Sequence, residues 1–298
     1  MRNKDDNKRG KGHHAPLAYE NEKFLDSPDG RILRILAEYQ EPLSRFRRER
    51  IQDTIVFFGS ARFHSRSDAE EALMLLEKPR SAKPAPPEEQ ERVRRARADV
   101  EMARYYEDAR ELAFLLTSWT KTLNQARHRF VVCTGGGPGI MEAANRGALE
   151  AGGKSIGMNI NLPFEQTPNH YITPELSFEF HYFFMRKLWF AYLAKALVVF
   201  PGGFGTFDEL FELLTLEQTE KLSKRICVVV YGTEYWRRIV NFDALVEAGT
   251  ISPKDLDLFH FADSPQEAFD QLRSHLELHH LEQHNHREKE PEIAKTRP

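Results

Sequence analysis

Two glycine-rich turns in this sequence have the composition of anion-binding sites. Each follows an apolar run typical of a buried strand and precedes a helical pattern, in CTGGGPGIMEA and FPGGFGTFDEL. A helix N-terminus presents unpaired N–H groups and a partial positive charge, and glycines let a phosphate approach that backbone closely. The glycines are Gly135, Gly136, Gly137 and Gly139 in the first turn, and Gly202, Gly203 and Gly205 in the second. Two such turns at one sheet edge indicate a ligand with at least one phosphate.

Neither turn fits the two common nucleotide-binding patterns. The dinucleotide pattern G-x-G-x-x-G starting at Gly135 requires a glycine where the chain has Ile140. In the second turn Asp208 occupies the third glycine position, and neither turn matches the P-loop pattern. The sequence therefore disfavours ordinary NAD binding and P-loop ATP binding. Tight turns that serve only packing remain an open alternative.

A carboxylate follows the second turn at Glu209, and two interpretations of it are open. Thr206 and Glu209 have the spacing of a capping box, with the threonine at the N-cap and the glutamate at N3. In the other interpretation, the same geometry holds a catalytic carboxylate beside a phosphate-binding turn.

A basic pair, Arg186 and Lys187, lies in HYFFMRKLWFAYLAK, which is apolar nearly all round and predicts a mostly buried helix. A buried guanidinium is costly without an anionic partner, so Arg186 faces either a ligand or a structural carboxylate. Neighbouring helical residues point about 100° apart. We therefore expect the two cations to take different directions, one into a pocket and the other toward water.

The elements that position these residues predict an α/β fold. Strand-like runs (TIVFF, RFVVCT, KSIGMNINLP, ELSFEF, ALVVF, ICVVVYG) alternate with helical patterns over about 30–50, 93–127, 182–195 and 235–248. Such alternation predicts a mostly parallel sheet covered by helices on both faces. We expect a disordered tail at 1–20, a single domain at 21–278 with a Pro-rich excursion at 77–91, and a disordered tail at 279–298.

Composition narrows the classes of function. The chain has 298 residues, a net charge of −3 and 41% hydrophobic residues, so no global basic field favours nucleic acid or an anionic membrane. The N-terminus lacks the apolar core of a signal peptide, and the most apolar stretch, 188–200, is too short to span a bilayer. Cys133 and Cys227 lie in strand-like runs without CxxC spacing. We expect a cytoplasmic protein without a disulfide framework or a metal site.

The motifs together resemble a known family. MRK at 185–187 followed by PGGFGTFDE at 201–209 is similar to the paired RK and PGGxGTxxE signature of the LONELY GUY family, cytokinin riboside 5′-monophosphate phosphoribohydrolases formerly labelled lysine decarboxylases. GGGPGIMEAANRGA matches the family's earlier turn, and LPFEQTPN at 162–169 looks like the larger bacterial branch, whose members include general nucleotide 5′-monophosphate nucleosidases. The resemblance covers roughly 54–276. It implies a Rossmann-like fold, a homodimer or higher oligomer, no cofactor, and hydrolysis of a nucleoside monophosphate to free base and ribose 5-phosphate.

The resemblance also implies roles for particular residues. Arg186 and Glu209 carry over as the catalytic pair. The residues that carry over as substrate-binding are Gly135, Gly136, Gly137, Gly139, Glu165, Lys187, Gly202, Gly203, Gly205, Thr206, Asp208 and Thr215. Asp208 replaces a glutamate that is common in the family, and Glu165 is placed only by the LPFEQTPN segment.

Three other functions are compatible with parts of the sequence. A nucleotide or molybdenum-cofactor carrier would use the glycine turns without hydrolysis. A pyridoxal-phosphate decarboxylase would form a Schiff base and give a yellow protein. An interaction protein would depend on its terminal extensions.

Overall fold

A seven-stranded parallel sheet forms the centre of the molecule. The computed structural model describes residues 15–78, 86–123, 125–162, 167–222 and 224–281. The strand order is β4-β3-β2-β1-β5-β6-β7, and each neighbouring pair is parallel. The strands are β1 (Thr54–Phe58), β2 (Val131–Thr134), β3 (Ser155–Ile160), β4 (Ser177–Phe180), β5 (Ala194–Val199), β6 (Cys227–Tyr231) and β7 (His260–Ala262). The six predicted strands are confirmed, and β7 is an addition whose three residues carry too little pattern to be recognised.

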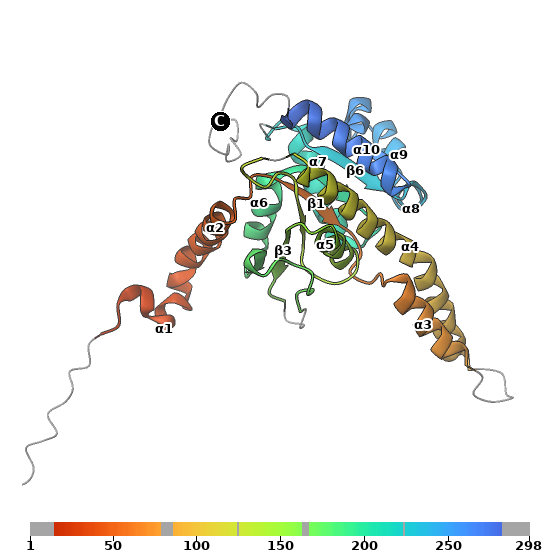
Figure 1. Ribbon diagram of the computed structural model, residues 1–298, viewed down its shortest axis with the longest axis horizontal. Coiled ribbons are helices and arrows are strands. Elements are labelled where there is room, and N and C mark those ends of the chain that lie inside the picture. Colours follow the sequence, from red (N-terminus) through yellow and green to blue (C-terminus); the bar gives the residue numbers. More distant parts are fainter. Residues whose placement is uncertain (1–14, 79–85, 124, 163–166, 223, 282–298) are drawn as a thin grey trace, which may run out of the picture.

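Ten α-helices surround the sheet within the described ranges (Figure 1). They are α1 (Glu22–Leu25), α2 (Arg31–Arg48), α3 (Arg66–Glu77), α4 (Pro87–Lys121), α5 (Ile140–Glu150), α6 (Phe183–Leu193), α7 (Phe204–Gln218), α8 (Thr233–Ile239), α9 (Phe242–Glu247) and α10 (Pro265–Leu276). Short 3₁₀ turns occur at Ala18–Glu20, Pro28–Gly30, Pro174–Leu176 and Pro253–Leu258, and a π-turn at Glu277–Leu281 extends α10. None of these helices is long and apolar enough to cross a lipid bilayer.

The core has two halves because the strands are buried on both faces. One half packs α4, α5 and α10 against side chains such as Ile55 and Val132, and the other packs α2, α6 and α7 against side chains such as Val56 and Cys133. The near-continuous apolar runs of the strands follow from this two-sided burial. The three layers confirm the predicted Rossmann-like α/β fold. Cys133 and Cys227 are buried and free.

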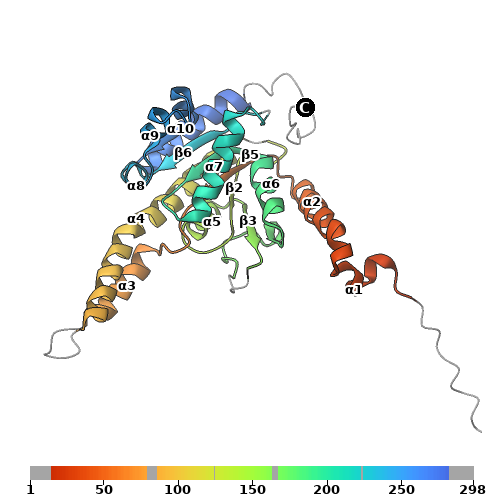
Figure 2. The same ribbon diagram turned by 180° about the vertical axis from the view of Figure 1, so that it is seen from behind.

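Some predicted boundaries were wrong. The helix expected from Val93 begins at Pro87, because proline suits the first helical position and two glutamates follow it in the first turn. The end of the predicted 77–91 excursion is therefore helical, while residues 79–85 lie outside the described part. Helices α3 and α4 lie side by side and extend away from the sheet, opposite to α1 and α2 (Figures 1 and 2).

The structure also differs from the predictions at the C-terminal tail and at the helix predicted over 235–248. The chain remains helical to Leu281, and buried His280 places its Nε2 2.9 Å from the Arg225 carbonyl oxygen, so a tail cannot begin at 279. Residues 1–14 and 282–298 lie outside the described part, and the division into two tails and one domain stays a prediction. The 235–248 pattern forms two helices, because Asn241 caps a new helix by accepting a hydrogen bond from the Ala244 N–H.

Candidate active site

The two glycine turns meet at the point where the strand order changes direction. From central β1 the chain builds outward through β2, β3 and β4, then crosses to β5 on the other side. The loop after β1 joins the turns, since the Ser60 N–H donates to the Pro201 carbonyl and the Ser60 carbonyl accepts from the Ile140 N–H, at 2.9 and 3.1 Å. In open α/β sheets, ligands bind at such a switch point, outside the carboxyl ends of the strands.

The second turn leaves two of its glycines in open space. A methyl group placed on Gly203 or Gly205 would meet no heavy atom within 4 Å, and neither residue has a positive φ. Gly202 differs, because a methyl group there would lie 2.1 Å from Thr206 Oγ1. Packing therefore accounts for Gly202 but not for Gly203 or Gly205, which keep the start of α7 accessible to a ligand.

The predicted capping box is wrong. Helix α7 begins at Phe204, its N-cap is Gly203, and no side chain caps it. Thr206 is thus the third helical residue and buried, and Glu209 lies in the second turn. Glu209 therefore has no capping role to explain its position.

Glu209 is a buried carboxylate between two cations. Its residue surface is 4% exposed, and its two carboxylate oxygens lie 4.0 Å from an Arg186 guanidinium nitrogen and 4.0 Å from Lys187 Nζ. Burial raises the pKa of Glu209 to about 7, although both cations oppose this shift. A carboxylate that titrates near neutrality suits general-base chemistry.

Arg186 and Lys187 converge on Glu209, contrary to the expectation that they point in different directions. Lys187 Nζ lies 2.8 Å from carboxylate oxygens of both Asp208 and Glu212. Arg186 is the more buried of the two, and burial lowers its pKa despite the charges of Glu209 and Asp208. Its guanidinium lies over the Phe183 ring, 5.2 Å from the centroid, and over the Phe190 ring at 5.6 Å.

Arg186 also approaches the first glycine turn. Its guanidinium would lie 4.0 Å from a methyl group placed on Gly135. The fold itself requires glycine at two other positions of this turn. Gly136 and Gly139 have φ of 75° and 72°, and a methyl group on either would clash with neighbouring atoms. Arg186 therefore lies between the first glycine turn and the Glu209 carboxylate of α7.

A buried asparagine shapes the first turn, and sequence analysis missed it. The Asn169 side-chain amide donates to the carbonyls of Gly136 and Gly137 and to Asn145, each at 3.0 Å. Asn169 ends the LPFEQTPN segment that carried part of the family resemblance, but that resemblance directed attention to Glu165. Residues 163–166 lie outside the described part, so the structure does not place Glu165.

Thr215 was expected to bind substrate, but its side chain lies away from Glu209. Glu212 was not expected at the site, but it belongs to the charge cluster around Glu209. Thr215 is exposed on α7, and its hydroxyl donates to the Phe211 carbonyl at 2.7 Å. Six helical residues from Glu209 correspond to about 600°, so the two side chains point to different sides of α7. Glu212, which the sequence analysis did not select, joins the charge cluster through Lys187; its spacing of three residues from Glu209 was the available signal.

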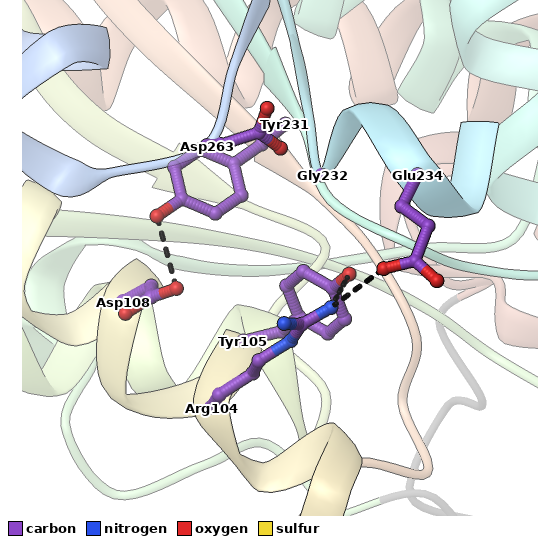
Figure 3. Close-up of a pocket in the computed structure, with 7 residues that line it drawn as sticks. All are labelled: Arg104, Tyr105, Asp108, Tyr231, Gly232, Glu234 and Asp263. Atoms are coloured by element: carbon purple, nitrogen blue, oxygen red, sulfur yellow. Dashed lines mark hydrogen bonds and ion pairs between the residues drawn. The ribbon is translucent and has the colours of Figure 1, made fainter. Parts of the chain in front are cut away.

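A separate cavity of about 270 Å³ lies at the ends of β6 and β7 (Figure 3). Its lining contains none of the predicted site residues and consists of Arg104, Tyr105, Asp108, Tyr231, Gly232, Glu234 and Asp263. Figure 3 shows that its polar groups bond to one another, including Tyr231 to Asp108 at 2.9 Å and Arg104 to Tyr105 at 2.8 Å. Among the described residues, no cluster of His, Cys, Asp or Glu is arranged to hold a metal ion.

The parallel sheet with helices on both faces defines a Rossmann-like α/β protein, and its candidate site lies at the carboxyl ends of the strands. Residues 141–272, which include Arg186 and Glu209, match the family model described as a possible lysine decarboxylase. The chain is 34% identical over 119 residues to the cytokinin riboside 5′-monophosphate phosphoribohydrolase of Rhodococcoides fascians, covering 39% of this chain and 58% of that enzyme. It is 28% identical over 158 residues to the Arabidopsis thaliana enzyme of the same name, LOG1, covering 52% and 72%. These matches support the resemblance to the LONELY GUY family, and the chain is similar to enzymes that carry the name of that family's activity.

Two solved structures are similar at low identity. A structural-genomics target protein is 20% identical with a TM-score of 0.45, covering 74% of this chain and 99% of its own. The molybdenum cofactor carrier protein of Chlamydomonas reinhardtii is 18% identical with a TM-score of 0.40, covering 75% and 98%.

Proposed function

We propose that this chain hydrolyses the N-glycosidic bond of nucleoside 5′-monophosphates of the AMP or cytokinin riboside monophosphate type, releasing the base and ribose 5-phosphate. The observation that carries the proposal is Glu209, a buried carboxylate held between two cations in the second turn of α7, one turn after the exposed N-terminus of that helix. The names of the related enzymes support the same reaction.

The geometry suggests how each group acts. The substrate phosphate binds the N–H groups at the start of α7, beside Gly203 and Gly205, and this remote contact positions C1′. As the bond from C1′ to the base breaks, positive charge develops on the ribose, and ionised Glu209 stabilises it. Glu209 also takes a proton from the attacking water, whose oxygen forms the new bond to C1′ as the bond to the base breaks. The base takes up one proton from solvent, and Glu209 returns its proton to solvent, so one water is consumed in each turnover.

The cations have complementary tasks in this proposal. Lys187 holds Asp208 and Glu212 in place, and Arg186 binds the ligand's negative charge, orients Glu209 or assists departure of the base. Although burial opposes the shift, the hydrogen bonds that Lys187 donates to Asp208 and Glu212 raise the pKa of Lys187. A lysine held protonated is a poor Schiff-base former, so this arrangement disfavours the pyridoxal-phosphate alternative.

The direct test is base release from a panel of nucleotides. Purified protein is incubated with AMP, GMP, IMP, CMP, UMP and isopentenyl-AMP, and ribose 5-phosphate is assayed. We expect product from at least one of them. Tight binding without product across the panel would contradict the proposal and favour a carrier.

The rate of hydrolysis should depend on pH through Glu209. The reaction needs the ionised carboxylate, so we expect kcat/KM to fall about tenfold per pH unit below a pKa of about 7. A bound phosphate adds negative charge near Glu209 and raises the pKa of the carboxyl in the complex. The acidic limb of the kcat profile should therefore lie at higher pH than that of the kcat/KM profile. Initial rates from pH 5 to 9 measure both limbs, and a kcat/KM that stays flat down to pH 5 would contradict the assignment.

The open glycines give a test of phosphate binding. We expect Gly203→Ala to leave the melting temperature nearly unchanged, because the methyl group meets no neighbour, and to raise KM at least ~10-fold by obstructing the phosphate. The matched control is Gly202→Ala, whose methyl group would clash with Thr206 and should lower the melting temperature. An unchanged KM for Gly203→Ala would show that the phosphate binds elsewhere.

We also propose a cytoplasmic homo-oligomer. Large apolar side chains are exposed beside the site, on α6 (Phe183, Phe184, Leu188) and α7 (Phe204, Phe211), and Phe204 is 97% exposed. A cluster of this kind is typical of a protein interface. Light scattering of the purified chain measures the oligomeric state, and a monomer at micromolar concentration would contradict this part.

A further inference from the structure

The start of α6, the helix that carries Arg186 and Lys187, contacts a carboxylate of α2. The two oxygens of Glu38, in α2, accept hydrogen bonds from the backbone N–H groups of His181 at 2.7 Å and Tyr182 at 3.2 Å. Tyr182 is the N-cap of α6, and it has no side-chain cap of its own. A carboxylate in this place satisfies free donors and complements the positive end of the helix dipole.

Helix α2 is anchored to α6 independently of this carboxylate. The Glu38 carbonyl accepts a hydrogen bond from the Trp189 indole N–H at 2.9 Å. The Trp189 ring also contacts Tyr39 and Phe46, with centroids 5.7 and 5.3 Å apart. The Glu38 side chain can therefore be removed without removing the contacts that dock α2.

The other end of α6 is held in the complementary way. Lys224 Nζ donates to the carbonyls of Ala191 at 2.7 Å and Tyr192 at 2.8 Å. Burial lowers the pKa of Lys224 well below its usual value, and the amine serves here as a hydrogen-bond donor to carbonyls that a helix end leaves without intrahelical partners. Helix α6 is thus clamped at its two ends by groups outside its own sequence.

The contact with Glu38 continues toward the site through one backbone link. Tyr182, whose N–H is held by Glu38, accepts a hydrogen bond at its carbonyl from the Arg186 N–H at 3.2 Å. The Arg186 guanidinium then lies 4.0 Å from Glu209. A shift in the first turn of α6 therefore moves Arg186 relative to Glu209.

We infer that Glu38 is a positioning residue, which sets the start of α6 and thereby the distance from Arg186 to Glu209; this role rests on the proposed hydrolysis. Charged groups from both helices face Glu209, namely Arg186 and Lys187 from α6 and Asp208 and Glu212 from α7. Moving the cations of α6 away by about 1 Å would weaken their attraction at 4 Å by about a fifth. The carboxylate would then be harder to ionise.

The test is Glu38→Ala, assayed by kinetics with AMP, or with whichever nucleotide of the panel the wild-type chain cleaves. We expect kcat to fall about tenfold, because a 1 Å displacement of a catalytic group can cost up to about 100-fold. KM should change little, and the acidic limb of the pH profile should rise by about half a pH unit. Glu38→Gln, which retains one acceptor oxygen, should be intermediate. The matched control is Glu41→Ala, on the same helix. Within the described part of the chain Glu41 pairs with Arg45, so this variant should behave as wild type.

The role of Glu38 can be tested whether or not the chain hydrolyses nucleotides. Wild-type kcat and pH profile in Glu38→Ala would overturn the inference, even if the variant melts at a lower temperature. If the wild-type chain cleaves no nucleotide, the Glu209 carboxyl is titrated by NMR in both proteins. A raised Glu209 pKa in Glu38→Ala then supports the positioning role, and an unchanged pKa overturns it. If Glu38→Ala fails to fold, Glu38→Gln is judged by the same criteria.

Discussion

Replacing Glu209 by glutamine is expected to abolish most activity while making the protein more stable. Loss of the charge should reduce AMP cleavage at least ~100-fold, on the scale of losing a general base or an electrostatic stabiliser. The pKa of Glu209 is about 7 in the folded protein, above its usual value of 4.5, so the folded chain binds more protons between these values. Stability from this group is then fully present below pH 4.5 and is lost as the pH rises through 7. At pH 8 the glutamine variant should gain up to about 3 kcal/mol in free energy of unfolding.

The control for this variant lies on the same helix. Glu217, two turns further along α7, also has a pKa raised by burial, and it lies away from the charge cluster. Glu217→Gln should therefore change stability in the same direction and leave turnover unchanged. Urea unfolding at pH 4 and pH 8 measures stability, and ribose 5-phosphate release measures turnover. Near-normal turnover in Glu209→Gln would refute the catalytic assignment.

The second large effect is expected at the opposite edge of the sheet. Asp53 and Arg129 form an ion pair with 1% side-chain exposure on each partner and a distance of 2.7 Å. Asp53 also accepts the Phe130 N–H at 2.6 Å, and Arg129 donates to the His280 carbonyl at 3.0 Å. Asp53→Ala leaves a buried guanidinium without its anion, so we expect a loss of about 3–5 kcal/mol in the free energy of unfolding.

A double-mutant cycle separates this effect from simple loss of packing. Arg129→Met alone should also destabilise, and the double variant should recover part of the loss because no unpaired charge remains. Activity per folded molecule should persist, since the pair lies at the amino ends of β1 and β2 and the candidate site lies at their carboxyl ends. Denaturant unfolding followed by circular dichroism provides the measurement. A cost below about 1 kcal/mol for Asp53→Ala would show that water or rearrangement compensates the charge.

The sequence by itself determined the α/β class, six of the seven strands and the segments that form the candidate site. These features are local, because strand runs, glycine turns and helical patterns are written in consecutive residues. The motif PGGFGTFDE was sufficient to select Glu209, and the basic pair in HYFFMRKLWFAYLAK was sufficient to select Arg186. The roles of the selected residues stay predictions.

Only the tertiary structure decided how the selected residues are arranged. Thr206 and Glu209 have the spacing of a capping box, yet α7 begins earlier, at Phe204 with Gly203 as its N-cap, and Glu209 is buried in the second turn. Arg186 and Lys187 converge, since long side chains can bend farther than their helical positions suggest. Asn169 bonds to the Gly136 carbonyl, which is 33 residues away in the sequence. Glu38 bonds to the Tyr182 N–H, which is 144 residues away. Such contacts depend on which surfaces pack together in the folded chain, and a local sequence pattern does not predict this packing.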